Sequence, residues 1–551
     1  MTFWIDQGRK LIVYPGHPGA LAQYIPEIQP INGRYFALPH TLPNLQLLAW
    51  HNWPVPTPMT DQNYDWPIEP GYTPLPHQKL YANFTVLHRR MFNLGDPGTM
   101  KTLSTLWAMD FLMRQAELVF EDFRCLIIAP LTILETVWAA GIYRNFFTRR
   151  TFEILTGTNE QRIKKLEADV DVYIVNPDGL KVGAHIRRKV NPARPHQKRI
   201  ELDGFSAALA AREDIKMVIV DEASNFKDHT TARHACATQI FGKRVQHLKQ
   251  LTGTPATKPI DAYGLAKLSN NAFGKSFTSF RLETMVKVSE FKWVPQKDGY
   301  DKAKRILIPA IRFGLDEIWG GPPMTYQTRM VALTDEQKKL MADLKKGLQV
   351  IVKSGRAIDA VNEAAARQKF LQISLGAVYD ESHNVHTVDA HPRYSEMEEI
   401  VESTERKVVI FVPLTSVVHL VDRYLKASWK KSGLDWTCDY INGEVKAKDR
   451  TRIIQAFATD PRFKAVICDP QATGHGINEF VAADTVIWLG AIDKTELWIQ
   501  GNGRIRRPGQ KYPSTCFKIV SNKLEEEIFN RLETNTSMQG AMLQAIRNGD
   551  F

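Results

Sequence analysis

Two kinds of hydrophobic pattern alternate along most of this chain. From about residue 75 onward, short apolar runs bounded by turn residues are separated by stretches that carry apolar residues three or four positions apart. Short continuous apolar runs indicate strands that are buried on both faces, whereas the three- and four-residue spacing indicates amphipathic helices. Their alternation predicts an α/β fold in which helices cover both faces of a parallel sheet.

The strand candidates form two series. The first contains FNLGD, CLIIAP, VYIVN, MVIVDEA and HLKQLTGT, and the second begins near Lys407 with KVVIFVP, TCDYING, FKAVICDP, DTVIWLG and CFKIVS. Between them lies a long stretch with helical spacing that starts at TDEQKKLMADL and ends at QKFLQISLG. We therefore predict two tandem parallel-sheet domains with a helical connector between them.

The chain divides into four expected segments. Residues 1–70 are rich in Pro, Trp and Tyr and carry short β-like runs, which indicates a small N-terminal α+β appendage that ends in a proline-rich linker. Residues 71–285 are expected to form the first α/β domain, with a basic surface insertion at 181–205. Residues 286–400 are expected to be an irregular and helical connector, and residues 401–551 the second α/β domain.

Composition narrows the class of protein. Apolar residues make up 44% of the chain and charged residues 24%, so it can bury ordinary cores. The excess of 71 Lys and Arg over 60 Asp and Glu gives a formal charge of +11, which suits a phosphate-rich partner but also a merely soluble basic protein. Five dispersed cysteines without a CxxC pair, and apolar runs shorter than the roughly 18–20 residues of a membrane span, favour a cytoplasmic protein.

The segment GDPGTMKT has the context of a phosphate-binding loop, because it follows a strand-like run and precedes an amphipathic helix. In such loops glycine lets backbone N–H groups approach phosphates, a lysine reaches the β- and γ-phosphates, and a Ser or Thr hydroxyl binds Mg²⁺. Met100 stands where a glycine usually precedes the lysine, and we expect it to have a negative φ, as at a helix start. The candidates are Gly95, Gly98, Thr99, Met100, Lys101 and Thr102.

Two further segments of the first series end in polar residues. The run KMVIVDEASNFK delivers Asp221 and Glu222 to the end of a strand, where one carboxylate can hold Mg²⁺ and the other can orient or deprotonate an attacking water. The run LTGTPAT is a strand that ends in a small, hydroxyl-rich turn.

The C-terminal run QGNGRIRRPGQ is rich in arginine. Gln500, Arg504, Arg507 and Gln510 are spaced so that they would share one face of a helix. Two arginines delivered by a second domain can stabilise charge on a γ-phosphate, a contact that contributes about 10³–10⁵ in rate. A solvated helix end or a plain contact with a phosphate backbone would give the same pattern.

The order of these motifs resembles the superfamily 2 helicases and translocases. The resemblance rests on Gln78, GDPGTMKT, APLTILETVW, VDEASNFK, LTGTP, DPQATGHGINEFVAADTVIWLG and QGNGRIRRPGQ, in that order, and extends from about residue 74 to about residue 535. Within the superfamily the chain is similar to the Swi/Snf-like branch, and most of all to its compact phage and bacterial members. This resemblance implies that both α/β domains are RecA-like.

The resemblance also implies roles for individual residues. Gln78 would read the adenine edge, Lys101 and Thr102 would bind phosphates and Mg²⁺, and Asp221 and Glu222 would form the catalytic pair. The remaining roles are coupling of hydrolysis to domain movement (Thr252, Gly253, Thr254), contact of the second domain with nucleotide and DNA (Gly474, Gly476, Asn478), arginine fingers (Arg504, Arg507), and contact with DNA strands (Pro130, Leu131, Thr132 and Ser416).

Ser224 stands where the family usually has a histidine after DEA, and that histidine couples the ATP site to the strand-contacting motifs. Because serine is shorter and carries no charge, the coupling is expected to be weaker or built differently here.

Two surfaces are open to two interpretations each. The basic insertion carries Arg187, Arg188 and Lys189, followed by Arg194, Lys198 and Arg199, and it is either a contact for the DNA backbone or a solvated loop. The appendage has aromatic residues interleaved with Arg34 and several His, which could stack on nucleic-acid bases or could form a small core. We expect most of these aromatic residues to be core: Tyr24, Tyr35, Phe36, Trp50 and Trp53.

The resemblance implies an enzyme, a DNA-dependent ATPase that uses ATP and Mg²⁺. Members of the branch usually move along duplex DNA without separating its strands, so we expect an ATP-dependent translocase that remodels duplex or branched DNA. A strand-separating DNA or RNA helicase and a weakly hydrolysing DNA- or nucleotide-binding module are the alternatives. The expected partners are nucleic acid and proteins of replication, recombination or repair, in the cytoplasm of a bacterium or a phage-infected host.

Overall fold

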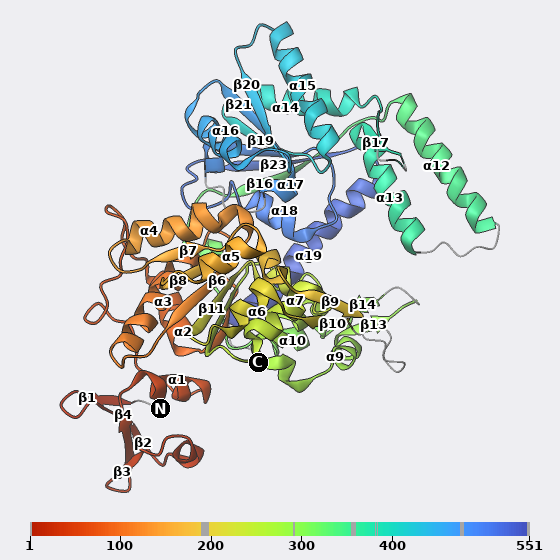
Figure 1. Cartoon of the computed structure of the whole chain (residues 1–551). Helices are drawn as coiled ribbons and strands as arrows, with labels where there is room; N and C mark the ends of the chain where they lie inside the picture. Colours follow the sequence, from red (N-terminus) through yellow and green to blue (C-terminus); the bar gives the residue numbers. More distant parts are fainter. Residues whose placement is uncertain are drawn as a thin grey trace. The chain divides into compact units, whose positions relative to one another are not determined.

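The computed structural model describes residues 3–188, 198–289, 293–353, 360–380, 382, 384–473 and 479–547. Their contacts divide the chain into two compact units (Figure 1). The first consists mainly of Met1–Val286 and Pro295–Gly314, and the second mainly of Leu315–Ala541.

The first unit is built around a parallel sheet which, among the described residues, has seven strands in the order β15-β5-β12-β11-β6-β8-β7. Alternate residues of β6 belong to two different core clusters, with Leu126 and Ile128 in one and Cys125 and Ile127 in the other. Both faces of the sheet are therefore buried, as the continuous apolar runs predicted. The strands are β5 (Arg90–Asn93), β6 (Arg124–Ile128), β7 (Phe152–Ile154), β8 (Val172–Val175), β11 (Ile215–Asp221), β12 (His247–Leu251) and β15 (Ala310–Ile311).

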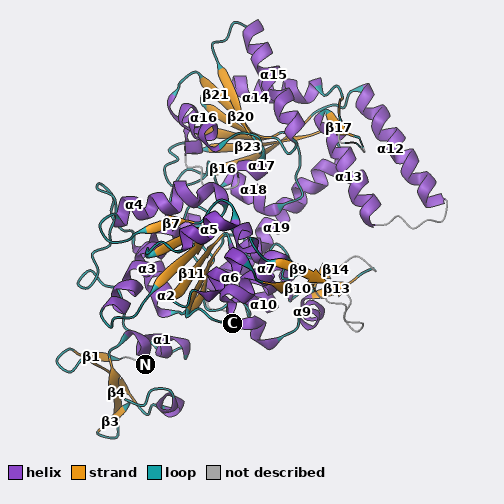
Figure 2. Ribbon diagram, in the orientation of Figure 1, coloured by secondary structure: helices purple, strands orange, loops and turns teal. Residues whose placement is uncertain are grey.

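Helices pack against this sheet (Figure 2). They are α2 (Pro76–Leu87), α3 (Lys101–Glu117), α4 (Ala140–Phe146), α5 (Asn159–Leu166), α6 (Gly204–Ala211), α7 (Ala232–Ala237), α8 (Ala262–Asn270), α9 (Phe277–Thr284) and α10 (Gly299–Lys304).

The second unit repeats this plan. Its sheet has, within the described residues, six parallel strands in the order β16-β23-β22-β19-β21-β20. Alternate residues of β19 again belong to two core clusters, with Val409 and Phe411 in one and Val408 and Ile410 in the other. The strands are β16 (Met324–Met330), β19 (Lys407–Phe411), β20 (Thr437–Ile441), β21 (Phe463–Cys468), β22 (Ala483–Trp488) and β23 (Ser514–Val520).

The helices from Leu315 onward include the long connector helices. They are α11 (Leu315–Ile318), α12 (Asp335–Lys353), α13 (Ala360–Leu375), α14 (His391–Ser403), α15 (Thr415–Lys431), α16 (Ala447–Thr459), α17 (Pro470–Thr473), α18 (Thr495–Asn502) and α19 (Lys523–Arg547), and a hairpin of β17 (Ala377–Tyr379) and β18 (Val385–Thr387) follows α13. The chain therefore has the predicted fold class, two tandem RecA-like α/β domains with helical connecting elements.

The stretch expected to be a connector also supplies one edge strand to each sheet. β15 pairs with β5 in the first sheet, and β16 pairs with β23 in the second. β15 contains two residues, and six of the seven residues of β16 are exposed. Neither strand gives the continuous apolar run by which the central strands were recognised.

The N-terminal residues form a small α+β module, as expected. Its antiparallel sheet has the order β1-β2-β4-β3, and the helix α1 (Leu42–Trp50) contributes Leu45 and Leu48 to the same core as Tyr14 and Phe36. The buried Gln46 fastens α1 to the first α/β domain, because its amide donates to the Val86 carbonyl at 2.8 Å. The strands are β1 (Trp4–Asp6), β2 (Leu11–Pro15), β3 (Gln29–Ile31) and β4 (Tyr35–Pro39).

The expectation that most aromatic residues of this module form its core was wrong. Phe36 is buried and Trp53 is half-buried, but Tyr24, Tyr35 and Trp50 are exposed. The aliphatic residues Ile12, Leu21 and Leu38 occupy much of the core instead.

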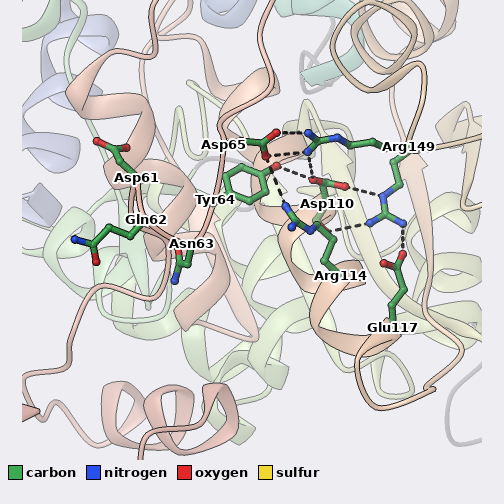
Figure 3. Close-up of a pocket in the computed structure, with 10 residues that line it drawn as sticks. Asp61, Gln62, Asn63, Tyr64, Asp65, Asp110, Arg114, Glu117 and Arg149 are labelled. Carbon is green, nitrogen blue, oxygen red and sulfur yellow. Dashed lines mark hydrogen bonds and ion pairs between the residues drawn. The ribbon is translucent and has the colours of Figure 1, made fainter. Parts of the chain in front are cut away.

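A network of ion pairs joins the linker after this module to α3 (Figure 3). The Tyr64 hydroxyl donates to Asp110 at 2.8 Å, and the Arg150 guanidinium donates to the same fully buried carboxylate at 2.7 Å. Asp65 pairs with Arg149 beside them, around a cavity of about 660 Å³. Because these charges neutralise one another, the cavity is best explained as a structural junction that fixes the linker.

The basic insertion forms a hairpin of β9 (His185–Arg188) and β10 (Lys198–Glu201). Residues 189–197, including Lys189, lie outside the described residues. A second short hairpin consists of β13 (Met285–Lys287) and β14 (Trp293–Pro295). Among the helices in the described part of the chain, none combines the length and apolar character that a membrane span requires.

Candidate nucleotide-binding site

The glycine-rich segment forms a closed loop between β5 and α3. The Lys101 ammonium donates to the carbonyls of Gly95 and Asp96, at 2.6 and 2.9 Å, so the loop folds around its own lysine. The buried Thr99 hydroxyl donates to the Asp96 carbonyl at 2.9 Å. A Cβ at Gly95 would lie 1.8 Å from the Tyr81 hydroxyl oxygen, so only glycine fits at the start of the loop.

Met100 has a left-handed backbone, with φ 59° and ψ 36°, and the expectation of a negative φ was wrong. Met100 lies immediately before the first residue of α3, and Gly98 two residues earlier also has a positive φ, of 87°. A residue with a Cβ pays about 1–2 kcal/mol for this conformation, which glycine adopts freely. Met100 is 40% exposed, so the packing of its side chain offsets little of this conformational cost.

Asp221 ends β11 and is held by two donors. The Trp138 indole N–H donates to one carboxylate oxygen at 2.9 Å, and the Glu222 backbone N–H donates to the other at 3.0 Å. Burial and the neighbouring Glu222 carboxylate raise the pKa of Asp221 to about 6, whereas Trp138 and Lys101 act to lower it. Glu222 has a φ of 49°, so a second strained residue directs this carboxylate pair.

Lys101 is the positive centre of the site. Burial lowers the pKa of its ammonium, and the carboxylates of Glu222, Asp221 and Asp96 oppose that shift. Arg312 forms an ion pair with Asp96 at 3.1 Å and also acts to lower the pKa of Lys101. Sequence reasoning missed Arg312, because it follows the short edge strand β15 and belongs to none of the recognised motifs.

The LTGTP motif packs directly against the phosphate loop. The Thr252 N–H donates to the Asn93 carbonyl at 3.0 Å, which continues the pairing of β12 with β5. A Cβ at Gly253 would lie 2.9 Å from a Pro97 ring carbon and 3.2 Å from the Gly95 carbonyl oxygen. A conformational change in the glycine-rich loop would therefore alter the contacts of the turn at Gly253.

These residues fit Mg²⁺-ATP. A loop of backbone amides, the Lys101 ammonium and the hard oxygen donors of Asp221 and Thr102 are groups of the kinds that bind phosphates and Mg²⁺. Thr102 lies in the first turn of α3, beside Lys101. Gln78 is buried at the start of α2, where its side-chain oxygen accepts the Leu75 N–H at 3.0 Å, and this leaves its amide group for a base.

The arginine motif of the second unit does not form one helical face. α18 ends at Asn502, so Arg504, Arg507 and Gln510 lie in the turns that follow it. Two glycines near the helix end weaken it, and the buried Asn502 side chain accepts the Trp488 indole N–H at 3.0 Å. Burial lowers the pKa of Arg507, and the Glu479 carboxylate opposes that shift.

Gly474, Gly476 and Asn478 lie outside the described residues.

The candidate DNA-contacting residues lie in different settings. Pro130 caps a short 3₁₀ turn, Leu131–Ile133, in which Leu131 and Thr132 are exposed. Ser416 was expected in a loop but lies in the first turn of α15, where its hydroxyl accepts the Tyr379 O–H at 2.9 Å. Arg187 and Arg188 lie on β9.

Trp138 belongs to the π-helical turn Leu134–Ala139 that follows the exposed 3₁₀ turn, and sequence reasoning gave it no role. Its indole N–H donates to Asp221, so this segment is linked to the carboxylate that ends β11.

The chain matches two families of known proteins. The SNF2-related domain family matches residues 92–383, more than half of the chain, and the family "Helicase conserved C-terminal domain" matches residues 393–509. "Putative protein p41" of Acyrthosiphon pisum secondary endosymbiont phage 1 is 22% identical over 86% of this chain and 99% of its own length.

Other similarities are more local. The human SWI/SNF-related matrix-associated actin-dependent regulator of chromatin subfamily A member 1 is 27% identical over 28% of this chain, and the match covers 16% of that protein. The structure of the Sulfolobus solfataricus SWI2/SNF2 ATPase core in complex with dsDNA matches with a TM-score of 0.38 and 19% identity, over 88% of this chain and 95% of that one. With its phosphate loop, its Asp-Glu pair and this family match, the chain belongs to the SNF2-related family of helicase-like ATPases.

Proposed function

We propose that this protein is an ATP-dependent DNA translocase, a DNA-stimulated ATPase that acts on duplex or branched DNA. The observation that supports the proposal is the arrangement of the first unit, in which Lys101 is held inside its loop and Asp221 accepts a hydrogen bond from Trp138. Relatives that share part of the chain include a "Chromatin-remodeling ATPase INO80" of Candida albicans, 26% identical over 24% of this chain and 9% of that protein.

In the proposed reaction, the loop amides and Lys101 bind the phosphates, and Asp221 and Thr102 hold Mg²⁺. The bound Mg²⁺ would neutralise charge on the phosphate oxygens. Glu222 orients the attacking water and accepts its proton. Thr252 and Thr254 lie in the turn that packs on the loop, so they are placed to respond when the γ-phosphate leaves.

DNA would act on this site through the segment from Pro130 to Trp138. In the proposal a DNA strand contacts the exposed turn at Leu131 and Thr132, and the π-helical turn that follows transmits the contact to Asp221 through Trp138. This route uses no side chain at position 224, where the family usually has histidine.

The two alternatives differ in specific features. A strand-separating helicase needs an element that parts the strands, and a strand-displacement assay would reveal that activity. A weakly hydrolysing binding module is suggested by the strained Met100 and by Ser224. The electrostatic interaction of Lys101 with Asp221 and Glu222 favours hydrolysis, because binding alone does not require the Asp-Glu pair.

The full-length phage relative also suggests a setting for this activity. We propose that the protein acts in the cytoplasm of a bacterial or phage-infected cell, with partners from replication, recombination or repair.

The first prediction concerns the substrate. ATP hydrolysis is measured without nucleic acid and with duplex DNA, single-stranded DNA, forked DNA and RNA, for the native protein and Glu222→Gln. Duplex or forked DNA should stimulate the native protein most, and the variant should bind ATP but lose at least about a hundredfold in rate, because it lacks the base. Binding of ATP and DNA without hydrolysis by the native protein would leave the binding module as the better explanation.

The second prediction concerns loop strain. Met100→Gly should bind a fluorescent ATP analogue up to about fivefold more tightly, because relief of about 1 kcal/mol raises the population of the bound loop conformation. Met100→Ala is the control, since it removes the long side chain but keeps the Cβ. Equal affinities for the two variants would show that the left-handed backbone does not limit binding.

The third prediction concerns Trp138. Trp138→Phe keeps the ring but removes the donor, so kcat should fall about tenfold, equivalent to about 1.4 kcal/mol, and half-maximal activity should need more Mg²⁺. ATP binding without Mg²⁺, measured by fluorescence titration, should not change. Trp107→Phe is the control, because Trp107 is equally buried in the same core but donates to the Pro67 carbonyl. If kcat fell equally in Trp138→Phe and Trp107→Phe, the loss would come from altered packing alone.

The fourth prediction concerns the arginines that we propose as γ-phosphate ligands. Arg507→Ala should reduce kcat about 10³-fold or more while ATP affinity changes little, because the contact forms chiefly in the transition state. Arg506→Ala is the neighbouring control, since Arg506 is engaged with Asp316 and should retain near-native turnover. Steady-state kinetics and ATP titrations separate the two effects, and a normal kcat in the Arg507 variant would contradict the assignment.

A further inference from the structure

The four-stranded sheet of the N-terminal module has one covered face and one outer face. Tyr14 and Phe36 point to the covered face and pack with α1 residues in the module core. On the outer face Trp4 lies opposite Val13, and Val13 lies opposite Ala37. Tyr35 shares this face with Ala37, because residues two apart on a strand point the same way.

Trp4 and Tyr35 form an aromatic pair across the outer face. Their ring centroids are 5.0 Å apart and the rings are nearly perpendicular, at 80°. Trp4 is 47% exposed and Tyr35 37% exposed, whereas Val13 and Ala37 beneath them are buried. The two rings thus present π surface to solvent above an apolar floor, in a module whose own core does not use them.

Positive side chains lie at both ends of this face. Exposed Arg9 and Lys10 form the turn between β1 and β2, and exposed Arg34 directly precedes Tyr35. The acidic residue at the first of these ends, Asp6, accepts the Arg9 N–H at 3.0 Å and lies 4.0 Å from the Arg9 guanidinium. Asp6 and Arg9 therefore offset each other, and Lys10 leaves this end with one net positive charge, while Arg34 is positive at the other end, so both ends favour anionic groups.

We propose that this outer face is a binding site for single-stranded DNA, separate from the translocating ATPase. Unpaired bases stack on Trp4 and Tyr35, and the adjoining phosphates approach Arg9, Lys10 and Arg34. Exposed aromatic rings flanked by cations are the combination that binds single strands without sequence preference, since every base has a π face. Paired bases in a duplex cannot reach the rings, so the site distinguishes unpaired from paired DNA.

The test compares two double variants of the full chain. Trp4→Leu/Tyr35→Leu keeps an apolar cover over Val13 and Ala37 but removes both rings, and Trp4→Phe/Tyr35→Phe keeps the rings. Tyr24→Leu/Trp50→Leu is the matched control, because both of these aromatic residues are exposed in the same module but lie outside the strands of the sheet. Circular dichroism and thermal melting establish that each variant is folded.

Binding of three fluorescent probes is measured by anisotropy: a thymidine oligomer, the same oligomer with abasic sites in place of bases, and a duplex of equal length. The native protein, the Phe variant and the control should bind the thymidine oligomer at least about tenfold more tightly than the abasic one, the size expected for one stacked base. The Leu variant should lose this preference and keep its affinity for duplex.

No preference for bases in the native protein, an unchanged preference in the Leu variant, or an equal loss in the control would overturn the proposal. Duplex-stimulated ATPase activity, measured on the same samples, should not change in the Leu variant. A failure of the single-strand site can therefore be told apart from a failure of the proposed motor function.

Discussion

The conformation of the glycine-rich loop depends on one ammonium group, that of the half-buried Lys101. Lys101 cannot remain charged away from water unless oxygen atoms surround it, and in this structure the Gly95 and Asp96 carbonyls supply them. Those contacts close the loop, and the loop requires the left-handed Met100 and the close approach of Gly253. Three strand ends, of β5, β11 and β12, must therefore meet at one edge of the sheet, which a parallel sheet provides.

The sequence was sufficient for the fold class and for the grouping of the nucleotide-site residues in the first unit. Each central strand is buried on both faces and so appears as an apolar run, and motifs that end such strands must share an edge. The edge strands β15 and β16 could not be found this way, because one is too short and the other is polar. Local backbone conformation could not be predicted either. Met100 was expected to have a negative φ but has a positive one. Arg504 and Arg507 were expected on a helix, but that helix ends at Asn502.

Trp138 and Ser224 are understood best together. In the proposed mechanism, the side chain that connects the DNA-contacting segment with Asp221 and Glu222 need not come from the residue after the DEA sequence. Here the Trp138 indole N–H donates to Asp221 from a neighbouring turn, and the indole is not a titratable group. The bond between Trp138 and Asp221 could be found only from the structure. An apolar residue in a helical stretch is ordinarily interpreted as core, and Trp138 is indeed part of the core.

The charge network around Asp110 has a consequence for how the chain could have been assembled in evolution. Asp110 and Arg150 are buried beneath the linker residue Tyr64, so the first α/β domain carries ionic groups whose environment the linker completes. The linker is thus tied to the first α/β domain. A recombination event that replaced the chain up to residue 70 would expose this junction, whereas one that ended before the linker would preserve it. The linker and the first α/β domain are therefore expected to have been inherited as one piece.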